Sequence, residues 1–106
     1  MKSHDFIGIA RMISEADAQA RERAADEVTD HLGAYTPVQA STLATLLAAT
    51  AVCESENAAL EAELHAVIAL TSTGHVDLEH IAPLQELVLA DLPPQLREYV
   101  SDLLEG

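Results

Sequence analysis

The residues Thr36-Pro37-Val38-Gln39, with the run ASTLATLLAATAVC that follows them to Cys53, decide the fold. The Thr36 hydroxyl can accept a backbone N–H at a helix start, and proline suits the first helical position. A Gln three residues after the cap completes a capping box. The run beyond is mostly Leu and Ala. We therefore predict a helix from Pro37 to about Cys53 that is buried on most of its sides.

Further helices are predicted on the N-terminal side of this one. Gly33 suits the end of a helix near Leu32, and the residues before it keep a helical apolar period. Ser14 and Asp17 are both able to cap a helix. Residues 1–33 therefore form either one helix or two, with the division near these two residues.

Three helices are predicted on the C-terminal side, each bounded by capping or helix-breaking residues. The first carries Leu60, Leu64, Val67 and Ile68 at helical spacing. The boundaries are Ser55 and Gly74 for that helix, Asp77 with a kink or restart at Pro83 for the next, and Pro93-Pro94 for the last.

The predicted helices repeat along the chain. A shift of 36 positions aligns Ala24, Val28, His31 and Leu32 with Leu60, Leu64, Val67 and Ile68, and these with Leu96, Val100, Leu103 and Leu104. This pattern resembles a short stack of HEAT-like helical hairpins. We predict an all-α fold of about six helices, stacked as antiparallel hairpins in a single domain over residues 1–106, with an irregular helical bundle as the alternative.

Composition bounds the class of partner. The 106 residues include 18 Asp plus Glu against 5 Lys plus Arg, which gives a formal charge of -13, and 49% are apolar. That apolar share is enough for one buried core. An acidic surface disfavours nucleic acid and anionic membranes, because phosphate groups are bound by clustered Lys and Arg. We expect a basic protein as the partner.

The single cysteine and the first residues suggest a cytoplasmic protein. Charges interrupt the N-terminal residues too early for a secretory signal, and the longest apolar run is well short of the roughly 20 residues that cross a bilayer. Cys53 has no second cysteine to pair with, which fits a reducing compartment. Because it ends an apolar run, we expect Cys53 to be buried rather than a reactive thiol.

The only residues with metal-ligand character close together are His75, Asp77, Glu79 and His80. Their spacing matches no helical metal motif, while Asp77 is explained as a helix cap and Glu79 as a first-turn acid. No glycine-rich phosphate loop or nucleophile elbow occurs in the chain. We therefore expect no metal, no cofactor and no enzymatic activity.

Acidic residues are uncompensated over most of the chain, because no Lys or Arg lies between Arg23 and Arg97. Glu22, Asp26 and Asp30 follow one another at four-residue intervals, where each like-charged pair costs about 0.2 to 0.5 kcal/mol in a helix. These residues either form a solvated surface that keeps an Ala- and Leu-rich chain in solution, or form a face for a basic partner.

In size, acidity and apolar pattern the chain resembles the small helical immunity proteins of bacterial polymorphic-toxin and contact-dependent inhibition systems. The resemblance implies a cytoplasmic protein that binds a cognate basic toxin, such as a nuclease, and neutralises it by occlusion. A helical-repeat scaffold or adaptor and an acidic nucleic-acid mimic are the alternatives. We expect a monomer or a weak homodimer. The candidate partner contacts are Glu22, Asp26, Glu27, Asp30, Tyr35, Glu61, Glu63, Asp77, Glu79 and Tyr99.

Overall fold

The computed structural model describes residues 1–105, and within them it contains helices and no strand. The predicted all-α class is confirmed. Residues before Gly33 form two helices, divided between Ile13 and Ala18 as Ser14 and Asp17 suggested. The elements are α1 (Ser3–Ile13), α2 (Ala18–Asp30), η1 (Leu32–Ala34), α3 (Pro37–Cys53), α4 (Asn57–Thr71), η2 (Leu78–Glu86), η3 (Leu89–Asp91) and α5 (Pro94–Glu105), where η marks a 3₁₀ helix.

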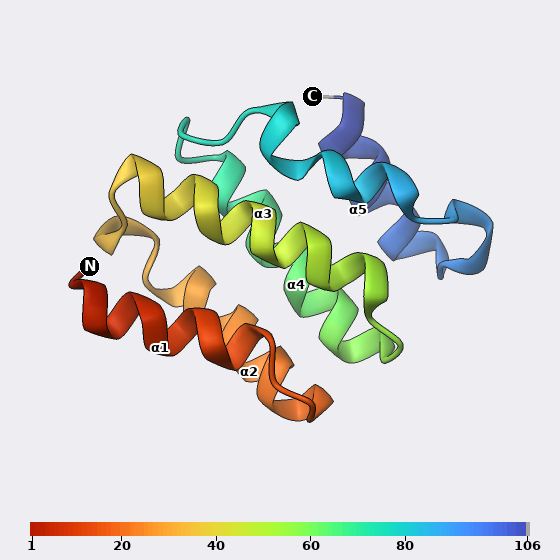
Figure 1. Cartoon of the computed structure of the whole chain (residues 1–106). Coiled ribbons are helices and arrows are strands. Elements are labelled where there is room, and N and C mark those ends of the chain that lie inside the picture. Colours follow the sequence, from red (N-terminus) through yellow and green to blue (C-terminus); the bar gives the residue numbers. More distant parts are fainter. Residues whose placement is uncertain (106) are drawn as a thin grey trace.

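The helices lie in two layers. Helix α3 contacts both α1 and η2 in the first layer, and α4 contacts both α2 and α5 in the second. Each helix of the first layer also contacts the helix that follows it in the second. Figure 1 shows α1, α3 and η2 on the near side, with α2, α4 and α5 behind them. The chain is thus arranged as successive helix pairs, and a relation of these pairs to HEAT repeats stays a prediction.

The capping box that opens α3 is present as the sequence predicted. The Gln39 backbone N–H donates to Thr36 Oγ1 at 3.1 Å, and the Thr36 N–H donates to Gln39 Oε1 at 3.0 Å. These two bonds satisfy backbone donors that the first turn of a helix leaves without intrahelical partners. The helix then runs to Cys53 with six residues buried. These are Ala40, Leu43, Ala44, Leu47, Ala48 and Ala51.

The aligned positions of the second layer share their burial. Val28, Leu64 and Val100 are fully buried, and they occupy the same position in α2, α4 and α5. The alignment fails at His31, because α2 ends at Asp30 and leaves the His31 side chain exposed. The His31 ring is instead within hydrogen-bond distance of the Glu27 carbonyl oxygen, with Nδ1 at 2.9 Å.

Three local predictions differ from the structure. Ser55 does not cap α4, because Glu56 holds the N-cap position. Helix α4 ends at Thr71 rather than Gly74, although Gly74 does supply the positive φ of 83° in the turn that follows. Cys53 is exposed, so the expectation that it is buried was wrong: as the last residue of α3 it lies beyond the buried part of that helix.

The segment from Leu78 to Glu86 is helical but irregular. It forms a 3₁₀ helix with a kink at Ile81, two residues before Pro83. Proline lacks the amide hydrogen that a regular helix needs, which agrees with the predicted break.

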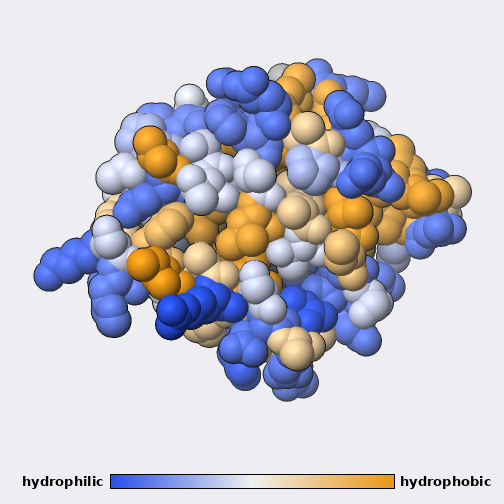
Figure 2. Space-filling view, viewed as in Figure 1, coloured by the Kyte–Doolittle hydropathy of each residue, from blue (hydrophilic) through white to orange (hydrophobic). Residues whose placement is uncertain are grey.

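The face formed by α1, α3 and η2 exposes apolar side chains between polar ones (Figure 2). No helix within residues 1–105 has the length and apolar character needed to cross a membrane.

Candidate functional site

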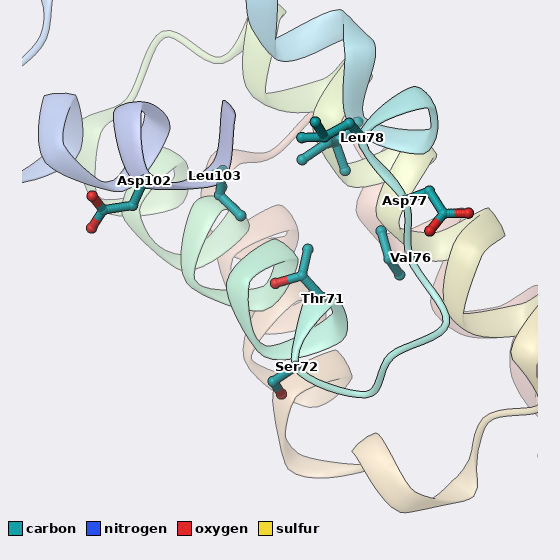
Figure 3. A pocket seen from close by; sticks show the side chains of 8 residues that line it. Thr71, Ser72, Val76, Asp77, Leu78, Asp102 and Leu103 are labelled. Carbon is teal, nitrogen blue, oxygen red and sulfur yellow. The ribbon is translucent and has the colours of Figure 1, made fainter. Parts of the chain in front are cut away.

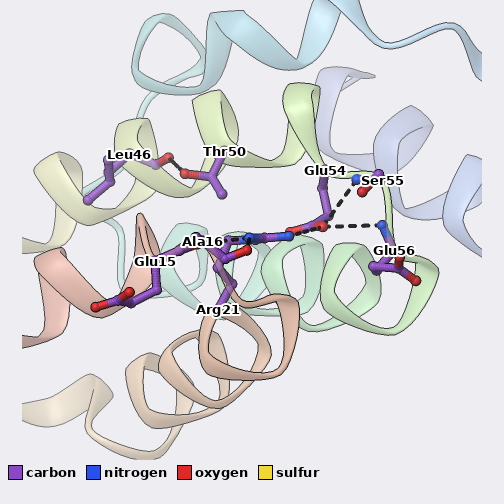
Figure 4. Close-up of polar contacts among 8 residues, drawn as sticks. All are labelled: Glu15, Ala16, Arg21, Leu46, Thr50, Glu54, Ser55 and Glu56. Atoms are coloured by element: carbon purple, nitrogen blue, oxygen red, sulfur yellow. Dashed lines mark hydrogen bonds and ion pairs between the residues drawn. The ribbon is translucent and has the colours of Figure 1, made fainter.

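A partly buried ion pair joins α2 to the end of α3 (Figure 4). Arg21 Nε and Nη2 donate to the two carboxylate oxygens of Glu54, each at 2.8 Å. Arg21 Nη1 also donates to the carbonyl oxygens of Glu15 and Ala16, both at 2.8 Å. One guanidinium therefore holds the α1–α2 link against the α3–α4 link, in the bidentate geometry that favours Arg over Lys.

The Glu54 carboxylate is fully satisfied. Besides the Arg21 bonds, its Oε2 accepts the backbone N–H groups of Ser55 at 3.1 Å and Glu56 at 3.2 Å (Figure 4). The hydrogen bonds from Arg21, and to a smaller extent the backbone hydrogen bond from Glu56, lower the pKa of Glu54 to about 2. Glu54 is thus ionised at neutral pH.

Glu63 is the buried polar residue that α4 brings to the same place. Its side chain has no exposed surface, and neither carboxyl oxygen accepts a hydrogen bond from any residue between 1 and 105. Burial first, and the Glu54 carboxylate second, raise the pKa of Glu63 to about 9. At neutral pH Glu63 therefore carries a proton.

This burial corrects the expectation that Glu63 contacts a partner. The sequence held a signal for it, because Leu60, Leu64 and Val67 surround position 63 on the same helix face and are all buried. Tyr35 needs the same correction. Its ring belongs to the core and its hydroxyl donates to the Val28 carbonyl oxygen at 3.2 Å, so it cannot serve as a surface anchor.

An acidic groove follows the outer seam between α2 and α4. Two adjoining hollows of about 370 and 550 Å³ share Glu22 and Ala58. We call them together the α2–α4 groove. Its described lining contains no Lys or Arg and five acidic residues: Asp17, Glu22, Asp26, Glu56 and Glu61.

Small side chains in its lining account for the hollow shape of the groove. Ala18, Ala58, Ala59 and Ala62 line it, and their short side chains leave space where α2 packs on α4. Tyr99 of α5 also lines the groove, with its hydroxyl accepting a hydrogen bond from Gln95 Nε2 at 2.9 Å. The groove thus combines carboxylates with one aromatic ring, a set of groups that can bind Lys or Arg side chains.

The structure brings together four of the predicted contact residues and separates the others. Glu22, Asp26, Glu61 and Tyr99 meet in the α2–α4 groove, whereas sequence reasoning did not place Asp17 and Glu56 there. Of the other six predicted residues, Glu63 and Tyr35 are buried, as described above. Four are exposed elsewhere: Glu27 beside α1, Asp77 in a pocket near the end of α4, and Asp30 and Glu79 outside both the groove and that pocket.

The His75–His80 segment forms a helix start. The Asp77 backbone N–H donates to His80 Nδ1 at 2.8 Å, which occupies that ring nitrogen. Within the described residues no three His, Cys, Asp or Glu side chains are grouped so that they could hold a metal ion.

Comparisons with protein-family models, with curated proteins and with solved structures find no match to this chain. Its function must therefore be inferred from the chemistry of its own surface.

Proposed function

We propose that this protein is an acidic binding module that takes a basic protein partner in the α2–α4 groove. The observation that supports the proposal most is the line of carboxylates, contributed by two helices, without a Lys or Arg among the described residues that line it. A net charge of -13 would attract a basic protein over a distance and speed its association. Binding of this kind weakens as salt increases.

We further propose that the partner is a bacterial toxin domain, and that this protein is its cytoplasmic immunity protein. Support comes from the all-helical fold and the acidity of the chain. In this proposal the protein neutralises the toxin by covering its surface and performs no chemistry. A nuclease fits as the toxin, because an enzyme that binds phosphates presents the basic residues that the groove would pair with.

Co-expression tests the immunity proposal directly. An immunity gene is expected directly downstream of a large toxin gene, so the C-terminal fragment of the upstream protein is the partner to test. We expect the fragment to stop growth when expressed alone and to be tolerated when this protein is co-expressed. Equal toxicity in the presence of the protein would refute the proposal.

A nucleic-acid mimic is a second candidate, because five acidic residues line one groove. It also predicts a basic partner, but duplex DNA should then compete with this protein for the partner. A scaffold that binds a peptide in an apolar groove predicts binding that depends little on salt. Measuring binding with added DNA and at two salt concentrations separates the three functions.

A further inference from the structure

A second pocket lies where α4 ends and α5 packs against it (Figure 3). It has a volume of about 400 Å³ and lies apart from the α2–α4 groove, with which it shares no lining residue. We call it the α4–α5 pocket. It is lined by Thr71, Ser72, Val76, Asp77, Leu78, Ile81, Asp102 and Leu103.

Val76, Leu78, Ile81 and Leu103 give the pocket an apolar part beside its polar residues. Ile81 and Leu103 are buried, and Leu78 leaves 51% of its surface in water. The two hydroxyl groups of the lining already donate to their own helix, Thr71 Oγ1 to the Ile68 carbonyl oxygen at 2.7 Å and Ser72 Oγ to that of Ala69 at 2.5 Å. The pocket therefore suits an apolar side chain, whose entry would remove the exposed Leu78 surface from water.

Acidic residues stand on opposite sides of this pocket. In Figure 3 Asp102 lies beyond Leu103 on one side and Asp77 beyond Val76 on the other, and the apolar side chains lie between them. Asp102 is in the last turn of α5, where the helix dipole disfavours an anion and where no basic residue occurs. Among residues 1–105, the lining of this pocket contains no Lys or Arg that could pair with either acid.

We propose that the α4–α5 pocket receives an apolar side chain from a basic segment of the partner, and that Asp77 and Asp102 pair with Lys or Arg residues flanking that side chain. This inference rests on the proposed function and adds a second contact surface to it. A buried apolar anchor within a charged rim is the usual arrangement of a binding hot spot.

The negative charge of the chain favours a basic partner segment over a second copy of the chain as the occupant of the pocket. Each copy carries a charge of -13, so two copies meeting at this pocket would bring like-charged rims together. A basic segment has the opposite charge and gains from the same rims. The pocket is therefore better suited to a basic partner than to self-association.

The test uses the ¹⁵N-labelled full chain and a short synthetic peptide with one central Leu flanked by Lys residues. We expect saturable amide shifts in residues 71–78 and 102–103. Leu78→Ala should weaken binding about fivefold or more, because it removes an apolar contact worth about 1 kcal/mol. The pair Asp77→Asn and Asp102→Asn should weaken binding and reduce its dependence on salt. Replacing the peptide Leu with Ser should weaken binding as Leu78→Ala does.

Matched controls change the same chemistry elsewhere. Val38→Ala removes an exposed apolar side chain from the start of α3, and Asp5→Asn with Glu15→Gln removes two charges outside this pocket. Neither control should change the affinity for the peptide.

Several outcomes would overturn the inference. Absence of saturable shifts at the pocket would do so, as would equal binding of the Ser peptide or no effect of Leu78→Ala. Shifts confined to Glu22, Asp26 and Glu61 would overturn it while supporting the proposed function. Self-association of the free protein that Leu78→Ala abolishes would assign the pocket to a second copy instead.

Discussion

Glu54 and Glu63 are two carboxyl groups with buried side chains in one cluster, and only Glu54 has a cation paired with it. Arg21 holds Glu54 through two hydrogen bonds of 2.8 Å, whereas Glu63 receives no hydrogen bond from any described residue. The pKa values separate accordingly, to about 2 for Glu54 and about 9 for Glu63. The pair thus keeps one charge and one proton over the whole neutral range.

Glu63→Gln is expected to change how stability depends on pH. The pKa of Glu63 is about 9 in the folded protein, against an ordinary value of 4.5. Between these values the unfolded chain loses the proton that the folded protein keeps. The contribution of Glu63 to the free energy of unfolding therefore falls as pH rises, by about 1.4 kcal/mol per pH unit. Glutamine does not ionise, so the free energy of unfolding of the variant does not fall in this way. The difference in stability between the variant and the natural chain should therefore shift in favour of the variant from acid to mildly alkaline pH.

Urea denaturation at several pH values between 5 and 8 measures this difference. Glu61→Gln is the matched control, because it makes the same chemical change at an exposed position of the same helix. Its stability should follow the pH dependence of the natural chain. A Glu63→Gln variant that did the same would show that Glu63 is ionised in the folded protein.

Arg21→Ala is expected to be strongly destabilising. It leaves the Glu54 carboxylate, whose own side chain is buried, without its cation. Arg21→Lys should recover only part of this, since an ammonium cannot make the two parallel bonds. Replacing both partners, as in Arg21→Met with Glu54→Leu, should be less harmful than Arg21→Ala alone. Thermal or urea unfolding of the variants checks this order, and an Arg21→Ala protein of natural stability would contradict it.

The contribution of Glu54 should be lost in acid. Because its pKa is lowered from 4.5 to about 2, the ionised form stabilises the folded protein above pH 4.5, and this stabilisation declines as pH falls toward 2. Glu54→Gln should therefore be less stable than the natural chain at neutral pH, and the difference should shrink over this acid range. A difference that stays constant between pH 5 and pH 3 would contradict the assignment.

The sequence predicts local structure here better than it predicts the site. The capping box at Thr36 and Gln39 involves residues three apart, so it is readable without the fold. The α2–α4 groove is different, because Glu22 and Glu61 meet only through the packing of α2 on α4. The apolar residues around position 63 can be read from the sequence, but the Arg21–Glu54 pair that affects Glu63 joins residues far apart in it.

Neutralising the α2–α4 groove should slow association with the basic partner that we propose. In the variant Glu22→Gln, Asp26→Asn, Glu61→Gln, three carboxylates that line the groove lose their charge while their shapes stay similar. Long-range attraction mainly affects the association rate, which we expect to fall about tenfold at low salt and less at high salt.

Stopped-flow measurements at two salt concentrations test this expectation. The control replaces Asp30, Glu79 and Glu86 with their amides, which removes the same net charge from exposed positions outside the groove. If attraction depends on where the carboxylates lie, the groove variant must associate more slowly than the control. Equal rates for the two variants would mean that only the total charge of -13 matters, and that the groove is not where the partner binds.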